Sequence, residues 1–328
     1  LLNRLKSSGL GCYIGSNFLG ALAYADDLTI LAPSAYATRQ MLTICSEYAA
    51  EFSITFNVSK TKCLIFDSEM KCKQPDCPQF CINDEAIENV GEWLHLGNLI
   101  NVALNDSAAV SARRINFIGQ ANDVLGFFAK LDPIVKNDLL FKYCSSFYGS
   151  VVWDLQCAEI SHICSAWRSA LRRIWHLPFN CHKLLIPVVS GRRPLFDEFC
   201  LRTMNFIMSC FSSGSSVVSF VCKHALVSGR MHSPIGRNVV FICQRYQLKQ
   251  NDFTVASRLK TMLAAVNRLC YDHMSAAISL DHLNLLLELL MLRDNIFSLQ
   301  FVDSGLDKLC IQDSINCVCT MQLFDVCL

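Results

Sequence analysis

Residues Leu22–Leu31 read LAYADDLTIL, with two adjacent carboxylates between two short apolar runs. Short apolar runs that flank turn-forming residues are typical of strands, so we expect a β-hairpin whose tip presents Asp26 and Asp27 at the end of a buried strand pair. Hard cations such as Mg²⁺ bind carboxylate oxygens and keep open positions for phosphates. The stretch therefore predicts a divalent-cation site at the tip of this hairpin.

The residues after the hairpin predict a β-β-α-β succession. Apolar residues from Met41 to Phe52 recur at helical spacing and would bury one face of a helix. Ile54 and Phe56 are predicted to form a strand, residues 57–60 (NVSK) a turn, and Cys63–Phe66 a second strand. In this arrangement the helix covers one face of the sheet, and Lys60 or Lys62 comes to the same edge as the acidic tip. Further along, Val90–Ile100 is strand-like, and Gly97 indicates a tight hairpin.

Helical patterns dominate after about Asn101. A long amphipathic helix is predicted from Ala108 to Leu131, and Asp132 followed by Pro133 signals the start of another helix. Lys136 and Lys142 are expected on a polar stripe of the apolar segment that follows. Further predictions in this half are a helix over Glu159–Trp175, a loop over Pro187–Pro194 and a helix over Leu195–Phe211.

The composition is that of a globular protein with a large core. The 328 residues are 52% apolar and 17% charged, with a mean hydropathy of +0.31. The net charge of +1 gives no global sign of a nucleic-acid partner, but Ser111–Arg193 contains 11 Lys and Arg against 5 Asp and Glu. Such a segment either follows a phosphate backbone or is a solvated helical face. No apolar run is long and uninterrupted enough to predict a membrane span, so we expect no membrane partner.

The 19 cysteines call for a separate explanation. Many occupy apolar positions, among them Cys45, Cys144, Cys164 and Cys210, and we predict that these are small core residues in a reducing compartment. Four further cysteines gather within one short stretch: Cys63, Cys72, Cys77 and Cys81. Their spacing lacks the CxxC pair of a zinc knuckle, so a zinc site is the less favoured interpretation. Trp153, Trp167 and Trp175 fit core positions better than base-stacking ones.

The order of these motifs resembles the reverse transcriptases of non-LTR, LINE-like retrotransposons. Residues 24–27 (YADD) are similar to that family's metal-binding box, 31–34 (LAPS) to the segment after it, 56–62 (FNVSKTK) to the next palm motif, and 94–97 (LHLG) to its primer-grip hairpin. The primer-grip match has Leu94 in place of Tyr, and His95 is an extra residue. Residues 143–153, 166–175 and 177–182 resemble the helical thumb. The resemblance covers roughly Leu1 to Tyr246.

The resemblance implies an RNA-directed DNA polymerase that uses two Mg²⁺ ions for nucleotidyl transfer. Asp26 and Asp27 would hold the metals, Lys60, or less favourably Lys62, would assist the pyrophosphate leaving group, and Leu94, His95, Leu96 and Gly97 would position the primer end. Contacts to the backbone of an RNA template and DNA primer would come from Arg113, Arg114, Lys136, Lys142, Arg168, Arg172 and Arg173. The family acts inside the cell, in cytoplasm and nucleus.

The resemblance also implies a division of an α+β chain into three parts. Residues 1–101 would be the C-terminal part of a polymerase palm, 102–193 a helical thumb, and 194–328 a helical region of unknown role. The family's first metal-binding Asp and its fingers would lie upstream of Leu1, so we expect this chain alone not to polymerise. Primer extension with Mg²⁺ or Mn²⁺ above an Asp26→Ala control would contradict that expectation. The alternatives are a catalytically inactive relic that binds nucleic acid through its helices, and a Cys-rich interaction module.

Overall fold

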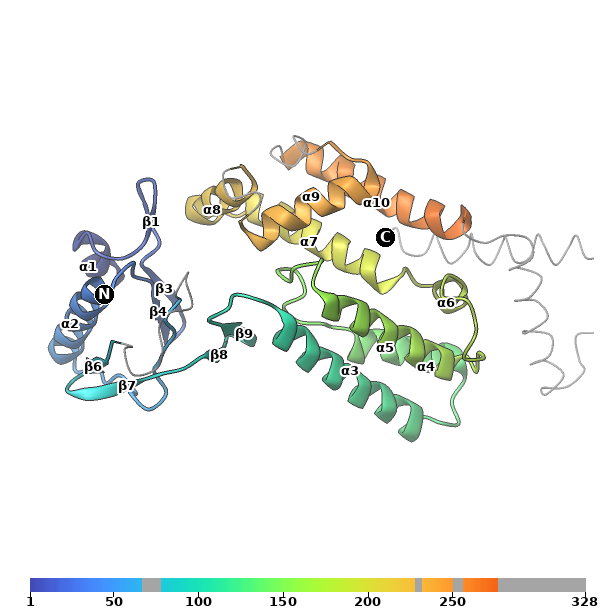
Figure 1. Cartoon of the computed structure of the whole chain (residues 1–328), viewed down its shortest axis with the longest axis horizontal. Helices are drawn as coiled ribbons and strands as arrows, with labels where there is room; N and C mark the ends of the chain where they lie inside the picture. Colours follow the sequence, from blue (N-terminus) through green and yellow to red (C-terminus); the bar gives the residue numbers. More distant parts are fainter. Residues whose placement is uncertain (67–77, 228–231, 250–255, 277–328) are drawn as a thin grey trace, which may run out of the picture. The chain divides into compact units, whose positions relative to one another are not determined.

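The computed structural model describes residues 1–66, 78–227, 232–249 and 256–276 (Figure 1). Helices and small sheets together make this an α+β protein, as predicted. The chain divides into two compact units. The first comprises Leu1–Ala109 and Ser213–His224, and the second comprises Val110–Ser212 and the described residues from Ala225 on. The predicted three-part division into palm, thumb and C-terminal region stays a prediction.

The first unit combines two helices near its start with short strands. Its elements in chain order are α1 (Leu2–Ser7), β1 (Tyr13–Ile14), β2 (Asn17–Phe18), β3 (Ala21–Tyr24), β4 (Asp27–Ile30), α2 (Ala35–Phe52), β5 (Lys62–Cys63), β6 (Phe80–Ile82), β7 (Glu85–Asn89), β8 (Glu92–His95) and β9 (Asn98–Asn101). Three antiparallel hairpins pair β1 with β2, β3 with β4 and β8 with β9, while β5, β7 and β6 form a sheet in that order. Most of α8 (Ser216–Val227) also belongs to this unit.

Helix α2 holds the core of the first unit together, as its apolar spacing predicts. The Ser34 hydroxyl accepts a hydrogen bond from the Ala37 amide at 3.2 Å, and Ser53 ends the helix with a left-handed backbone (φ 51°). One stripe of the helix, with Met41 and Cys45, packs against the β3–β4 hairpin. The neighbouring Leu42 packs with residues of β6 and β7. The helix therefore fixes both strand groups to one core.

The acidic hairpin forms where the sequence predicts it, but it is not buried on both faces. Strands β3 and β4 pair in the register Tyr24–Asp27, which leaves a two-residue loop. Leu28 and Ile30 face the core, whereas Leu22 and Tyr24 are 51% and 66% exposed. The prediction of a buried strand pair is therefore wrong for one face, because the pleat turns alternate side chains away from α2.

The base of this hairpin depends on two glycines. A Cβ on Gly11 would lie only 2.9 Å from the Cα of Gly20, and Gly11 has φ +94°. Glycine alone allows both the close approach and the left-handed backbone. The Leu31 amide then bonds the Gly20 carbonyl at 2.8 Å, and the Cys12 amide bonds the Leu31 carbonyl at 2.9 Å. These contacts tie the hairpin to the preceding segment.

The predicted strand at Ile54 and Phe56 does not form. After the left-handed Ser53 the chain runs without a strand partner, and Ile54 is 47% exposed. The turn at residues 57–60 is present, and it leads into β5, which is only two residues long. Lys62 and Cys63 pair in parallel with Glu88 and Asn89 of β7. The side chain of Asn57 shapes this turn locally, so no long strand is needed to bring the chain around.

The second unit is helical throughout its described part. Its elements are α3 (Ser107–Phe127), α4 (Pro133–Leu139), a π-helical turn (Leu140–Cys144), α5 (Ala158–Ile174), α6 (Leu185–Ser190), α7 (Leu195–Phe211), α9 (Pro234–Tyr246) and α10 (Ala256–Ala276). Only the first turn of α3 lies outside this unit. Helix α5 packs against α4, α6 and α7, while α7 also packs against α9 and α10. The core of the unit lies along α5 and α7.

Most helix predictions for this half are confirmed. Helix α7 has the predicted bounds, α5 starts and ends one residue early, and Asp132 caps α4 by accepting from the Ile134 amide at 2.7 Å. The loop predicted over Pro187–Pro194 is wrong in its first half, because α6 continues to Ser190. Pro187 lies in the first turn of α6, where a missing N–H costs no helical hydrogen bond.

Candidate functional site

The two carboxylates lie at an exposed tip. Asp26 occupies the second loop position of the β3–β4 hairpin, and Asp27 is the first residue of β4, paired with Tyr24. Both residues are exposed. The other loop residue, Ala25, has φ +52°, a left-handed backbone that alanine adopts at some cost. The sharp turn therefore presents two neighbouring carboxylates to solvent.

The β8–β9 hairpin contacts the acidic hairpin. The His95 Nε2 atom lies 3.2 Å from the Thr29 hydroxyl, across 66 residues of sequence. Thr29 stands on β4 two residues after Asp27, so both side chains lie on the face of the hairpin that turns away from α2. Leu96 (φ +46°) and Gly97 (φ +75°) form the loop of the second hairpin, in the two left-handed positions of a type I′ turn. The fold thus brings the hairpin that carries residues 94–97 against the hairpin that carries residues 24–27.

The two candidate lysines have different surroundings. Lys62 forms an ion pair of 2.6 Å with Glu88 and lies 5.7 Å from the centre of the Trp93 ring. The Lys60 side chain is exposed, and its backbone amide donates to the Asn57 carboxamide at 3.1 Å. The structure therefore holds Lys62 against β7 and β8 and presents Lys60 to solvent. Among the described residues, no hydrogen bond or ion pair joins Lys60 to either aspartate.

The acidic tip fits a magnesium ion only as part of a larger ligand set. Nowhere in the described residues do three or more His, Cys, Asp or Glu side chains gather as a metal site. Mg²⁺, however, usually keeps several waters and is bound through one or two carboxylates together with substrate phosphates. Two exposed, adjacent carboxylates match that mode. They do not match a closed structural site made of protein ligands alone.

The cysteines do not converge on zinc in the described part of the chain. Cys63 lies on β5 and packs against the core, whereas Cys81 lies on β6 and is exposed between the buried Phe80 and Ile82. Strand β7 separates the two, so the thiols are on different strands and different faces of the sheet. Cys72 and Cys77 lie outside the described residues. Of the predicted core cysteines, Cys45, Cys144 and Cys164 are buried and Cys210 is half-buried.

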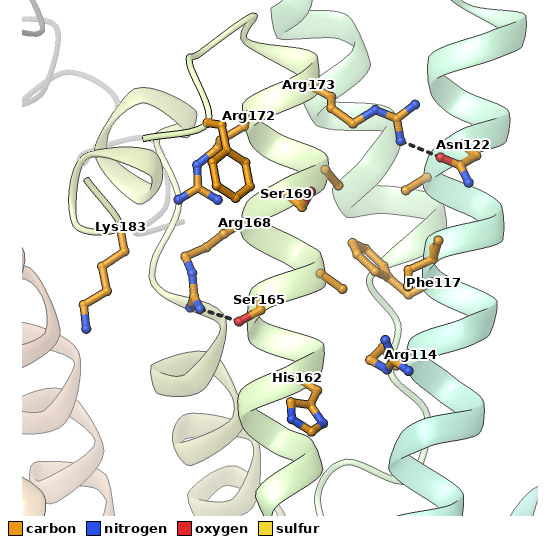
Figure 2. A pocket seen from close by; sticks show the side chains of 15 residues that line it. Arg114, Phe117, Asn122, His162, Ser165, Arg168, Ser169, Arg172, Arg173 and Lys183 are labelled. Carbon is orange, nitrogen blue, oxygen red and sulfur yellow. Dashed lines mark hydrogen bonds between the residues drawn. The ribbon is translucent and has the colours of Figure 1, made fainter. Parts of the chain in front are cut away.

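A cationic groove of about 890 Å³ lies on the second unit (Figure 2). Helix α3, helix α5 and the segment from Phe179 to Lys183 line it. The lining includes four of the predicted nucleic-acid contacts together with a lysine and a histidine, namely Arg114, Arg168, Arg172, Arg173, Lys183 and His162. Figure 2 shows Arg168 and Arg172 extending from α5 toward Lys183, while Arg173 reaches the other way, to α3. No Asp or Glu is among the lining residues.

The groove arginines are held by neutral partners. Arg168 donates to the Ser165 hydroxyl at 2.8 Å, Arg172 to the Cys181 carbonyl at 3.1 Å, and Arg173 to the Asn122 carboxamide at 2.6 Å. Burial, together with the nearby charge of Arg172, lowers the pKa of Arg168, although the Cys164 thiol opposes this. The guanidinium groups are therefore positioned, and their charges are not neutralised by these partners.

Arginines elsewhere in the same unit have acidic partners instead. Each lies within ion-pair distance of a carboxylate: Arg192 with Asp138, Arg193 and Arg202 with Glu198, Arg237 with Asp154, and Arg245 with Asp197. Within the described residues, no ion pair involves Arg114, Arg168, Arg172, Arg173 or Lys183. In the described part of the chain, the positive charges of the groove are therefore not neutralised by ion pairs.

The remaining predicted contacts lie elsewhere. Arg113 lines a neighbouring pocket of about 450 Å³ and lies 5.7 Å from the centre of the Tyr148 ring. Lys142 is exposed on the π-helical turn. The prediction for Lys136 is wrong, because this side chain is only 3% exposed and its ammonium donates to the Ala129 carbonyl at 3.4 Å. It binds the end of the preceding helical segment and does not face a nucleic acid.

Two groove residues, Phe179 and Lys183, were missed by the sequence reasoning, and His162, which the sequence favours as a structural histidine, is exposed in the groove. His162 shares a face of α5 with Ser165, Ser169 and Arg173, so helical spacing contained the signal. Phe179 and Lys183 follow the helix, and nothing in their local pattern separates them from an ordinary loop. Trp153 and Trp167 are buried, which confirms the prediction that they are core residues, and Trp175 is half-buried.

No protein-family model and no curated protein matches this chain. The helices in the described part of the chain are too short or too polar to cross a membrane.

Proposed function

We propose that this chain is part of a LINE-like reverse transcriptase, in which its first unit contributes the acidic hairpin of a two-Mg²⁺ nucleotidyl-transfer site. The observation that carries the proposal is the contact between His95 and Thr29, 3.2 Å long. It joins the hairpin that carries the metal-binding box to the hairpin that resembles the primer grip; the two lie far apart in the sequence and in that family act on the same primer end. A chance match to a four-residue motif gives no reason for such a contact.

The chemistry assigned to each residue follows from its position. Asp26 and Asp27 would hold Mg²⁺, and the bound metal would supply a lowered pKa for a primer hydroxyl and neutralise charge on the nucleotide phosphates. Lys60 is exposed and can reach an anionic leaving group, whereas Lys62 already pairs with Glu88. The turn at Leu96–Gly97 would present its backbone to a primer end beside the acidic face, whereas the exposed Leu94 points to the face of β8 opposite His95.

The nucleic-acid partner is supported by the second unit. Its groove collects positive charges that have no acidic partner among the described residues, and phosphate contacts from Arg and Lys dominate the affinity of nucleic-acid binding. A second candidate function therefore has its own support: binding of nucleic acid by the helices with no chemistry at the hairpin. The groove favours this candidate as strongly as the first, so only the hairpin distinguishes them. A Cys-rich zinc module gains no support from the described cysteines.

Metal-directed cleavage tests the hairpin directly. Fe²⁺ replaces Mg²⁺ at carboxylate sites, and with ascorbate and peroxide it cuts the protein backbone beside the bound ion. We expect cuts near Asp26 and weaker cuts near Leu96, suppressed by excess Mg²⁺ and lost in Asp26→Asn with Asp27→Asn. Asp84 is a matched control, because it lies in another hairpin loop of the same unit.

The control variant Asp84→Asn keeps the left-handed backbone of its turn, since asparagine tolerates φ +64°. It is expected to leave the cleavage pattern unchanged. Cuts that persist without both hairpin carboxylates, or that disappear in the Asp84 variant, would contradict the metal site. Binding of nucleic acid without any hairpin-dependent cleavage would favour the second candidate.

A further inference from the structure

We infer that the cationic groove on α3 and α5 binds a single-stranded nucleic-acid segment, with phosphates on Arg168, Arg172 and Arg173 and a base stacked on Phe179. The inference rests on the proposed nucleic-acid partner but changes its form, since the resemblance implies contacts to a template–primer duplex. It also adds Phe179 and Lys183 to the binding residues.

The case for an anion comes from how the charges are held. A guanidinium carries five N–H donors, and single hydrogen bonds to Ser165 and Asn122 fix the positions of Arg168 and Arg173 without neutralising them. Like charges gathered in one groove repel one another, which makes the empty groove unfavourable. Phosphate oxygens relieve that repulsion and accept the remaining donors in pairs, as arginine geometry favours.

The case for a base comes from Phe179. This side chain is 93% exposed, yet it lines the same groove as the arginines. Aromatic side chains beside a basic track are the usual stacking platforms for unpaired bases, and each stacked base contributes about 1–3 kcal/mol. An acidic peptide would pair with the same positive charges, but its carboxylates would not stack on an exposed aromatic ring. The combination of phenylalanine and unpaired arginines therefore favours nucleic acid.

The case for a single strand comes from the shape of the site. The Arg173 guanidinium of α5 reaches the Asn122 carboxamide of α3 at 2.6 Å, so side chains of the two helices meet across the groove. A duplex is wider than its own major groove of about 12 Å and can therefore rest only on the rim. Arg168 and Arg172 are half-buried within it, so a narrower strand reaches them better. Bases in a duplex are also stacked on one another and leave no free face for Phe179.

Fluorescence anisotropy with a labelled oligothymidylate of about 12 nucleotides tests the inference, because single-strand sites span about 4–16 nucleotides. The same sequence annealed to its complement is the duplex arm, and a polyglutamate peptide is the acidic-peptide arm. We expect the full chain to bind the single strand most tightly. Phe179→Ala should weaken that binding about tenfold and leave the duplex unaffected.

Further variants test the phosphate contacts and show whether the effects are specific to the groove residues. Arg168→Gln with Arg172→Gln should lower the slope of log Kd against log salt by about 1.4, since each single-strand phosphate contact contributes about 0.7. Phe127→Ala is the matched aromatic control, because Phe127 is 83% exposed on α3 outside the groove. Arg192→Ala is the matched arginine control, because its charge pairs with Asp138. Both controls should bind as the parent chain does.

The inference is overturned if the duplex binds as tightly as the single strand, if polyglutamate competes equally, or if Phe179→Ala and Phe127→Ala bind alike. Because Phe179 is almost fully exposed, its loss does not threaten folding. The outcome is separate from that of the metal-cleavage experiment. If the single-strand preference is absent, the proposal of a metal site at the hairpin is unaffected. If hairpin cleavage is absent, the proposal of a nucleic-acid site in the groove is unaffected.

Discussion

Asp197 shows how one buried residue can join three helices. Its carboxylate is 4% exposed at the start of α7, and it accepts hydrogen bonds from Arg245 at 2.8 Å and from the Tyr246 hydroxyl at 2.6 Å. Cys270 of α10 in turn contacts that hydroxyl at 3.7 Å. Burial works against the charge of Arg245, but the bond to Tyr246 and the charge of Asp197 outweigh it and raise its pKa. The cluster ties α7 to α9 and α10.

Replacing Asp197 by Ala should therefore destabilise the second unit strongly. The change leaves the buried Tyr246 hydroxyl without its acceptor and takes a partner from the half-exposed Arg245, and an unsatisfied buried donor costs about 1–3 kcal/mol. Urea unfolding followed by far-UV circular dichroism measures the loss. Asp138→Ala is the control, because the Asp138–Arg192 pair is exposed and contributes at most about 1 kcal/mol. Equal losses in both variants would contradict the role given to Asp197.

Buried thiols make the free energy of unfolding of the second unit depend on pH in the alkaline range. Burial raises the pKa of the Cys164 thiol from 9.0 to about 12, so the folded protein keeps this group neutral while the unfolded chain ionises it. Its stabilisation is complete below pH 9 and is lost as the pH rises from 9 toward 12. The free energy of unfolding should fall by about 1.4 kcal/mol per pH unit from this group alone.

Cys164→Ala should remove that part of the slope. Urea unfolding at several alkaline pH values measures it, with tryptophan fluorescence as the signal because Trp153 and Trp167 lie in the same unit. Cys81→Ala is the control, since that thiol is exposed. Superimposable slopes for the parent chain and the Cys164 variant would show that this thiol ionises equally in both states.

At the scale of elements, the β8–β9 hairpin depends on its turn. Leu96 and Gly97 both have positive φ, which only glycine adopts freely, so Gly97→Ala should destabilise the hairpin by about 1 kcal/mol or more. Hydrogen exchange of the amides from Leu94 to Leu99 should become faster. Gly91→Ala is the control, because a Cβ there meets no neighbour and the backbone is ordinary. Faster exchange in the Gly91 variant as well would point to a general loosening instead.

Elements whose signals are local were predicted well from the sequence. Helix α2 follows from its apolar spacing and the serine cap, and α4 from Asp132 and Pro133. The strand expected at Ile54 and Phe56 failed because strand formation needs a partner, which a local pattern does not reveal. Lys136 failed for a related reason, since its burial depends on where the end of α3 lies. The contact between His95 and Thr29 could be expected only from the family resemblance.

At the scale of the whole molecule, most of the described cysteines are residues of the packed core. No disulfide forms among the described cysteines, and six of them are buried in the second unit, in helices or in the loops between them. Their spread along the chain explains why their number alone predicted neither disulfides nor a metal cluster. The groove differs from the cysteines, because the sequence did predict most of its charged residues. Its arginines were found from charge, but that no ion pair holds them became visible only from the positions of the carboxylates in the described part of the unit.

Thiol labelling of the intact chain should follow this pattern. With N-ethylmaleimide we expect Cys81 to be modified quickly, because it is exposed, while Cys164 and Cys200 stay unmodified until the chain unfolds. Burial raises the pKa of Cys200 to about 12 as well, so little reactive thiolate is present at neutral pH. Peptide mass spectrometry separates the sites. Labelling of Cys164 at the rate of Cys81 in native buffer would contradict the described core.

The carboxylate-free groove gives dissolved salt two opposite effects on one surface. In the unliganded protein, ions screen the repulsion among Arg168, Arg172 and their neighbours, so added salt should raise the free energy of unfolding of the second unit. In the proposed complex with a single strand, the same ions would compete with the phosphates and weaken binding. The salt concentrations that most stabilise the free protein are therefore those at which it should bind the proposed strand most weakly.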